Sequence, residues 1–169
     1  MGQKRKIQIP KALNSELASL DGIIRSDGSI FFGQDHHNDL IIFGYFPDDL
    51  AFFKYHVALL ITKIHRNAHI KFRKYASSGN CLHIEVHSKA IASFWNKVMN
   101  IPNDKLDFEL CPKIIINKEL VIPNIRNYFD GDGTINFSPS TRRFSLNPIK
   151  VNYYPLISWS TQSKKVANQ

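Results

Sequence analysis

The sequence predicts an α+β protein made of two copies of one structural unit. The first observation is a repeated motif, an apolar helical turn ending in Asp-Gly-Ser/Thr-Ile, which occurs at 20–30 and again at 125–135. The second is an alternation of apolar and polar residues after each motif, which is typical of strands. The third is helical spacing of apolar residues between the strand pairs. We therefore expect the order helix, two strands, helix, two strands, helix, followed by a second, shortened repeat.

Small residues mark one face of the first motif helix. Gly22 and Ser26 are four residues apart, so two helix backbones could approach closely along that face. In the second copy the corresponding positions hold Asn127 and Gly131. We expect these four residues to form the interface between the two motif helices.

Each motif helix is followed by a carboxylate and a glycine. Asp27 precedes Gly28, and Asp132 precedes Gly133, and glycine commonly ends a helix. If the helices cross side by side, the two carboxylates meet at one end, where they repel unless a divalent cation lies between them. Oxygen ligands favour Mg²⁺ or a similar ion. The alternative is that both Asp-Gly pairs are ordinary turns, with glycine chosen for positive φ, but this does not explain two matching apolar helices.

The first unit can be predicted element by element. Its expected elements are strands at 29–34 and 40–46, a helix at 47–64, strands at 68–75 and 81–87, and a helix at 89–99. In the second strand pair, one face holds the apolar residues Ala68, Ile70, Phe72, Leu82, Ile84 and Val86. The polar residues between them should point to the other face of the sheet.

The second unit has room for a single hairpin. We expect strands at 134–138 and 150–160, joined by a polar turn that contains Arg142 and Arg143, and then the start of a helix. This gives a first half-domain at 12–112, a connector at 113–123 and an apparently truncated second unit at 124–169. A Pro-punctuated segment, 101–123, leads to the second motif.

Composition limits the classes of partner. Lys and Arg number 22 against 14 acidic residues, and the resulting charge of +8 suits a surface that follows phosphates. No apolar run is long enough for a membrane helix or a signal peptide, so no membrane partner is expected. Two cysteines indicate neither a disulfide framework nor a zinc site. An intracellular location, cytoplasmic in a prokaryote or organellar, is the resulting expectation.

The repeated motif resembles that of the LAGLIDADG homing endonucleases of archaeal or organellar introns and inteins. Their pattern L-x-G-x-x-x-x-D-G is matched at Leu20, Gly22, Asp27 and Gly28, whereas the second copy departs from it at Asn127. The resemblance covers most of 17–123. It implies α-β-β-α-β-β-α half-domains whose antiparallel sheets form a saddle in the DNA major groove, with outward side chains that contact bases and phosphates.

The resemblance also implies an activity, the metal-dependent hydrolysis of phosphodiesters in double-stranded DNA by an intron-encoded nuclease. Mg²⁺ or Mn²⁺ would be the cofactor. The implied catalytic residues are Asp27, Asp132 and Lys105, and the implied metal site contains Asp27, Asp132, Gly28 and Gly131. The implied DNA-binding residues are His69, Lys71, Arg73, Tyr75, His83, Arg142 and Arg143.

Two other functions remain open on the same scaffold. One is a DNA-binding module that does not cleave, which the short second unit and Asn127 favour. The other is an RNA maturase, which would use a similar basic surface. For the endonuclease, the target would be long and either near-palindromic or asymmetric. The active assembly would be a monomer that pairs its own motif helices, or a homodimer that pairs two first motifs.

Overall fold

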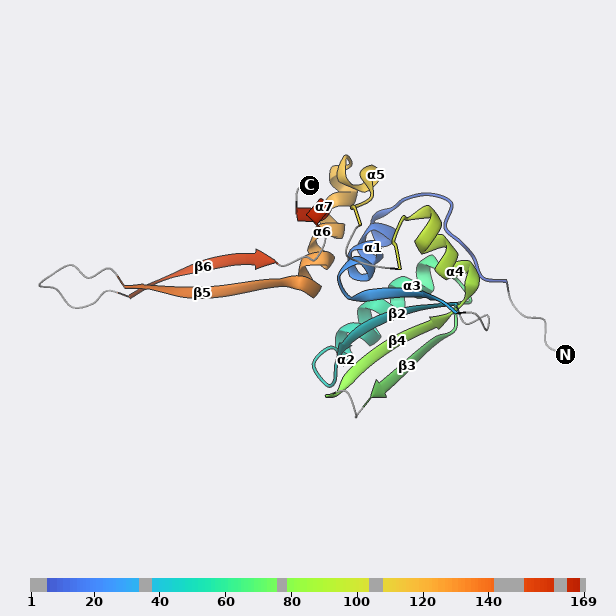
Figure 1. The fold of residues 1–169 in the computed structure, drawn as a ribbon, viewed down its shortest axis with the longest axis horizontal. Coiled ribbons are helices and arrows are strands. Elements are labelled where there is room, and N and C mark those ends of the chain that lie inside the picture. The colour runs from blue at the N-terminus through green and yellow to red at the C-terminus, as the bar shows by residue number, and fades with distance from the viewer. Residues whose placement is uncertain are drawn as a thin grey trace, which may run out of the picture.

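The structure, a computed structural model, describes residues 6–33, 38–75, 79–103, 108–141, 151–159 and 164–167 (Figure 1). The first unit contains α1 (Ser15–Asp27), β1 (Gly28–Phe32), β2 (Asn38–Tyr45), α2 (Leu50–Phe52), α3 (Ala58–Ile64), β3 (Ile70–Tyr75), β4 (Cys81–His87) and α4 (Lys89–Ser93). Two π-helical segments, Phe53–Val57 and Phe94–Val98, join α2 to α3 and extend α4. The second unit contains α5 (Pro112–Ile115), α6 (Lys118–Asp132), β5 (Gly133–Thr141), β6 (Val151–Trp159) and α7 (Lys164–Ala167). The predicted α+β class and the order of elements are confirmed.

The first unit is built on a four-stranded antiparallel sheet with the strand order β1-β2-β4-β3. Helices α1, α3 and α4 cover one face of this sheet (Figure 1). Leu82, Ile84 and Val86 are buried under the helices, as their alternation predicts. Phe72 lies on the same face, opposite the buried Ile84, but it is 40% exposed because β3 is an edge strand with a neighbour on one side only.

Side-chain caps fix where the two motif helices begin. The Asn14 side chain accepts a hydrogen bond of 2.8 Å from the backbone N–H of Leu17, at the start of α1. The Asn117 side chain likewise accepts a hydrogen bond of 2.9 Å from the backbone N–H of Glu119, so α6 begins at Lys118. Pro123 lies inside α6. The segment expected to be a connector therefore includes α5 and the first turns of α6. The domain boundaries at 112 and 123 stay a prediction.

Glycine ends both motif helices for a reason that the sequence did not indicate. Gly28 and Gly133 have φ values of −91° and −90°, so neither adopts the left-handed conformation expected of a helix-ending glycine. The chain instead turns directly into a strand, and the turn leaves no space for a side chain. A Cβ on Gly28 would lie 2.7 Å from Ile24 Cα, and one on Gly133 would overlap Phe129.

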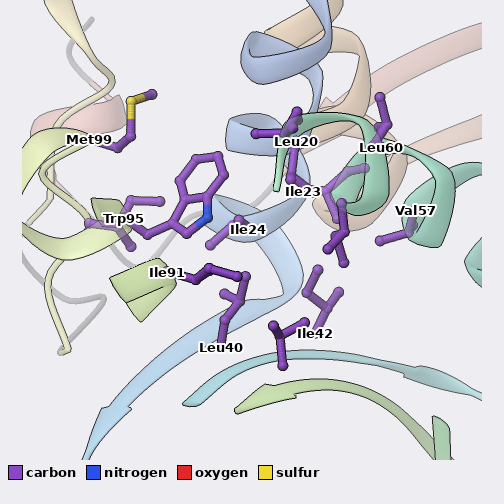
Figure 2. Packing of buried hydrophobic residues seen from close by; sticks show 14 of the residues in the cluster. Leu20, Ile23, Ile24, Leu40, Ile42, Val57, Leu60, Ile91, Trp95 and Met99 are labelled. Carbon is purple, nitrogen blue, oxygen red and sulfur yellow. The ribbon is translucent and has the colours of Figure 1, made fainter. Parts of the chain in front are cut away.

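One hydrophobic core fills the space between α1, the sheet and the helices of the first unit (Figure 2). Leu20 and Ile24 of α1 meet Leu40 and Ile42 of β2, and Trp95 closes the side toward α4. All five are 0% exposed. Burial of each aliphatic side chain contributes roughly 1.5–3 kcal/mol, so this core holds α1 in place.

The second unit repeats the helix and hairpin but leaves the corresponding apolar residues exposed. Ile125 and Ile135 correspond in the repeat to Leu20 and Ile30, yet they are 42% and 57% exposed, whereas Leu20 and Ile30 are buried. The described part of the second unit has no counterpart of α3, β4 or α4 to cover them. Strands β5 and β6 pair in antiparallel register, and the hairpin extends away from the first unit (Figure 1).

No helix in the described part of the chain is long and apolar enough to cross a membrane. Three predicted site residues, Lys105, Arg142 and Arg143, lie outside the described residues.

Candidate active site

The two motif helices lie against each other, and glycine makes this possible. A Cβ added at Gly22 of α1 would overlap the carbonyl oxygen of Asn124 and lie 3.0 Å from the backbone nitrogen of Tyr128. The α1 backbone therefore touches the α6 backbone at this point. Close contact of backbones at small residues is the arrangement that the repeated motif predicts.

The second glycine contact lies at the carboxylate end of the crossing. A Cβ on Gly131 of α6 would overlap Asp27 Oδ2 and Ser26 Oγ of α1. Asp27 is the last residue of α1, and Asp132 is the last residue of α6. Both are half-buried. The end of α6 thus lies directly beside the Asp27 carboxylate.

A cleft opens beside Asp27. Its volume is about 480 Å³, and its polar lining includes Asp27, Asp49, Asn127 and Asp130. Asp132 is not among the described residues that line it. Oxygen atoms of carboxylates and amides are the ligands that Mg²⁺ prefers, and Mg²⁺ usually keeps several waters and takes only one or two carboxylates. The residues present therefore fit a hydrated divalent cation, although the described residues contain no cluster of three or more acidic, His or Cys groups placed to hold one.

Asn127 departs from the motif, and the structure accommodates its side chain by hydrogen bonds. Its Nδ2 donates to the Pro123 carbonyl at 2.8 Å, and its Oδ1 lies 3.1 Å from His56 Nε2. Asn127 is 7% exposed. Because its polar atoms have partners, a residue larger than glycine is tolerated here at the edge of the crossing.

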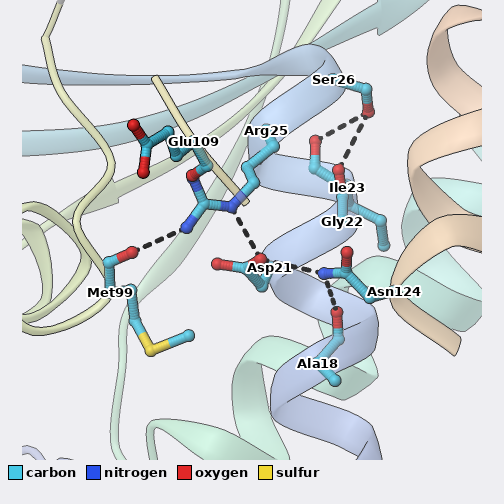
Figure 3. Close-up of polar contacts among 9 residues, drawn as sticks. All are labelled: Ala18, Asp21, Gly22, Ile23, Arg25, Ser26, Met99, Glu109 and Asn124. Carbon is cyan, nitrogen blue, oxygen red and sulfur yellow. Dashed lines mark hydrogen bonds and ion pairs between the residues drawn. The ribbon is translucent and has the colours of Figure 1, made fainter. Parts of the chain in front are cut away.

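A buried polar network that the sequence reasoning missed ties the helices together (Figure 3). Arg25 Nε donates to Asp21 Oδ2 at 2.7 Å, and Asn124 Nδ2 donates to the same oxygen at 2.9 Å and to the Ala18 carbonyl at 2.9 Å. The Arg25 Nη groups donate to the carbonyls of Met99 and Glu109, each at 2.7 Å. This network links α1 to α6 and to the segment after α4.

The pKa of Asp21 reflects two opposing effects. Burial raises the pKa of this carboxyl, while the Arg25 guanidinium and the Asn124 amide act in the opposite direction. A signal for the pair was present in the sequence, since Asp21 and Arg25 have opposite charges and are four residues apart on α1.

The outer face of the four-stranded sheet carries four of the predicted DNA-binding residues of the first unit, and the fifth, His69, immediately precedes β3. His69, Lys71 and Arg73 are exposed, and Tyr75 and His83 are half-buried. Lys71, Arg73 and Tyr75 lie opposite Glu85, His83 and Cys81 in the β3–β4 register. The structure therefore brings these side chains to one face, and burial lowers the pKa of His83 there.

Comparison with known proteins gives a result for the fold. No protein-family model matches the chain, and no curated protein matches it in sequence. Comparison with solved structures shows that this chain has the fold of the LAGLIDADG homing endonucleases.

Solved structures of one such enzyme, the homing endonuclease I-DmoI, are similar to this chain. The complex of I-DmoI with DNA and Ca matches at a TM-score of 0.53 and 16% identity, covering 71% of this chain and 58% of that one. A variant of I-DmoI, bound to its target DNA nicked in the coding strand and with Mn present, matches at 0.51 and 16%, covering 71% of this chain and 62% of that one. The match thus spans less than two thirds of these I-DmoI chains. The predicted resemblance is confirmed at the level of the fold.

Proposed function

We propose that this chain is a site-specific endonuclease that binds double-stranded DNA and hydrolyses it with divalent cations. The observation that carries the proposal is the glycine-mediated contact of α1 and α6, which brings the Asp27 carboxylate beside the end of α6. Two ordinary helix-to-strand turns would not require the helices before them to touch at Gly22 and Gly131. The net charge of +8 supports a nucleic-acid partner.

The similar structures support the same class of partner. I-DmoI is described in complex with its target DNA in the presence of Mn, and in complex with DNA and Ca. We extend DNA binding and dependence on a divalent cation from those proteins to this chain as part of the proposal.

Asp27 and Asp132 would hold the cations. Each carboxylate lies at the end of a motif helix, and Gly131 lets the Asp27 carboxylate rest against α6. A divalent cation bound there would neutralise the scissile phosphate and lower the pKa of an attacking water. The roles of Gly28 and Lys105 at this site remain predictions from the resemblance.

Pairing of the motif helices within one chain is also part of the proposal. The face of α1 that holds Gly22 and Ser26 is occupied by α6 of the same chain. A homodimer that pairs two first motifs would have to displace α6 and break the Asn124–Asp21 hydrogen bond. We therefore favour a monomer with pseudo-twofold symmetry over that homodimer.

The test is cleavage of a plasmid library that carries candidate intron-insertion sites. We expect cutting at a defined site in Mg²⁺ or Mn²⁺ and binding without cutting in Ca²⁺. Sequence-specific binding without cleavage in any cation would instead identify a DNA-binding module. Tight binding to structured intron RNA, with no preference for duplex DNA, would favour an RNA maturase.

A further inference from the structure

Glu85 lies at the centre of the outer face of the sheet. No pattern in the sequence identifies this acidic residue as a candidate functional residue. It lies on β4 between Ile41 of β2 and Lys71 of β3 in the strand register. It is only 4% exposed. A carboxylate so far from water is costly unless charged or hydrogen-bonding groups surround it.

Arg73, Tyr75 and His87 provide those partners, and His83 lies beside them. Arg73 Nε lies 2.8 Å from Glu85 Oε2, and the Tyr75 hydroxyl donates to Oε1 at 3.0 Å. His87 Nε2 lies 3.4 Å from Oε2, and His83 Nδ1 lies 4.0 Å from Oε1. Glu85 is therefore the common partner of Arg73, Tyr75 and His87.

The arginine differs from the other partners in its exposure. The Arg73 side chain is 49% exposed, while the Glu85 side chain beneath it is 5% exposed. The ion pair is made through Nε, the guanidinium nitrogen nearest the chain, and Nη1 and Nη2 form the far end of the group. Arginine reads guanine with a bidentate pair of hydrogen bonds to O6 and N7, which that far end can supply.

We propose that Glu85 is a positioning residue that determines specificity by fixing Arg73 for the recognition of one guanine. The inference rests on the proposed DNA binding through this face. Holding Arg73 at Nε reduces the rotamer freedom that would otherwise be lost when the side chain meets a base, which favours the correct contact. Lysine could not replace this arginine, because an ammonium group offers no planar pair of donors.

The charge of Glu85 should also affect the affinity for DNA. Glu85 carries a negative charge on a face that approaches phosphates, so it weakens the attraction to DNA of any sequence. Removal of that charge should strengthen non-specific binding while it weakens the preference for guanine. A residue that only stabilises the sheet would not change affinity and specificity in opposite directions.

The experiment is selection of bound duplexes from a DNA library with a randomised core, performed with the wild type and with E85Q, R73K and K71Q. We expect the wild type to prefer guanine at one position by about 5- to 150-fold. R73K should lose that preference, and E85Q should reduce it at least about 5-fold while other positions keep theirs. E85Q should also bind a fixed non-specific duplex more tightly than the wild type, whereas K71Q should weaken binding to all sequences alike.

The double variant E85Q/R73K separates positioning from direct contact. If Glu85 acts through Arg73, the double variant has the same base preferences as R73K alone. Thermal melting of each variant without DNA verifies the fold, and R73K, which changes an exposed side chain, serves as a test if E85Q does not fold. An unchanged consensus for either E85Q or R73K, with wild-type binding intact, would overturn this inference and leave the proposed function standing. A wild type that selects no duplex at all would overturn both.

Discussion

Gly131 of α6 lies so close to Asp27 of α1 that a Cβ on residue 131 would overlap the Asp27 carboxylate oxygen Oδ2. The same Cβ would overlap the hydroxyl oxygen of Ser26. The position of the candidate catalytic carboxylate is therefore set in part by the absence of a side chain on the neighbouring helix.

The two interface glycines should respond differently to a methyl group. Gly22→Ala places its Cβ against backbone atoms of Asn124 and Tyr128, so we expect a loss of roughly 1–3 kcal/mol in unfolding free energy. At Gly131→Ala, all three nearest atoms belong to side chains: Asp27 Oδ2 and Ser26 Oγ, which can rotate away, and Ser26 Cβ at 2.6 Å, which requires a small shift of α1 against α6. That variant should lose cleavage with a smaller loss of stability. Urea unfolding and a cleavage assay measure both effects, and equal stability losses would contradict this distinction.

The carboxylates at the helix ends should be required for cleavage. Asp27→Asn and Asp132→Asn should each lower the rate by at least about 100-fold, because each removes a charge that holds a cation. DNA affinity should change little, since neither residue is expected to touch bases. The control is Asp130→Asn, which changes an exposed carboxylate that lines the same cleft as Asp27. Loss of cleavage in Asp130→Asn but not in Asp132→Asn would assign the second metal ligand to Asp130.

Arg25 should be essential for stability. Arg25→Met removes the partner of the buried Asp21 carboxylate and the donor to the carbonyls of Met99 and Glu109. Breaking a buried ion pair in this way typically costs about 3–5 kcal/mol. Arg126→Met, a matched change on an exposed arginine of α6, should stay within about 0.5 kcal/mol. Chemical denaturation of both variants gives the comparison, and similar losses would mean that the network contributes little.

The repeat provides a matched pair of aliphatic residues. Leu20→Ala should cost about 2–5 kcal/mol, because Leu20 is 0% exposed in the core. Ile125→Ala, at the corresponding position of the second motif, should cost about 1 kcal/mol or less, because Ile125 is 42% exposed. If the Ile125 variant lost as much stability as the Leu20 variant in solution, the exposed face of α6 would have to be covered by another surface.

Stability should fall on mild acidification because of His65. Burial lowers the pKa of His65 from 6.5 to about 4, and its Nε2 accepts a hydrogen bond from Trp95 Nε1 at 3.1 Å. The unfolded chain takes up a proton near pH 6.5, whereas the folded protein does so only near pH 4. The folded state is therefore disfavoured progressively as pH falls through this window, by up to about 3 kcal/mol.

The variant His65→Gln removes the titrating group and keeps a carbonyl that can accept from Trp95. Its unfolding free energy, measured at several pH values, should decline less steeply than that of the wild type between pH 6.5 and about 4. Parallel curves for the two proteins would show that another group causes the acid sensitivity.

Local patterns in the sequence predicted the helices and strands of the first unit and the contact between the two motif helices. The repeated apolar motif predicted α1, strict alternation predicted the buried side of β4, and the repeated Asp-Gly ending predicted where the two motif helices stop. These features depend on neighbours within a few residues, so a single sequence contains them. The exposure of Phe72 did not follow from its face, because alternation gives the face of a strand but not its position at the edge of a sheet.

Contacts between distant residues could be decided only by the tertiary structure. The sequence alone determined that two similar helices end in carboxylates, but the fold decided that Gly131 meets Asp27 and that Asn124 shares the Asp21 carboxylate with Arg25. It likewise decided that Glu85 holds Arg73, since strand register brings β3 and β4 together. The physical reason is that a polar side chain is satisfied by whichever donor or acceptor packing brings within about 3 Å, whatever the separation along the chain.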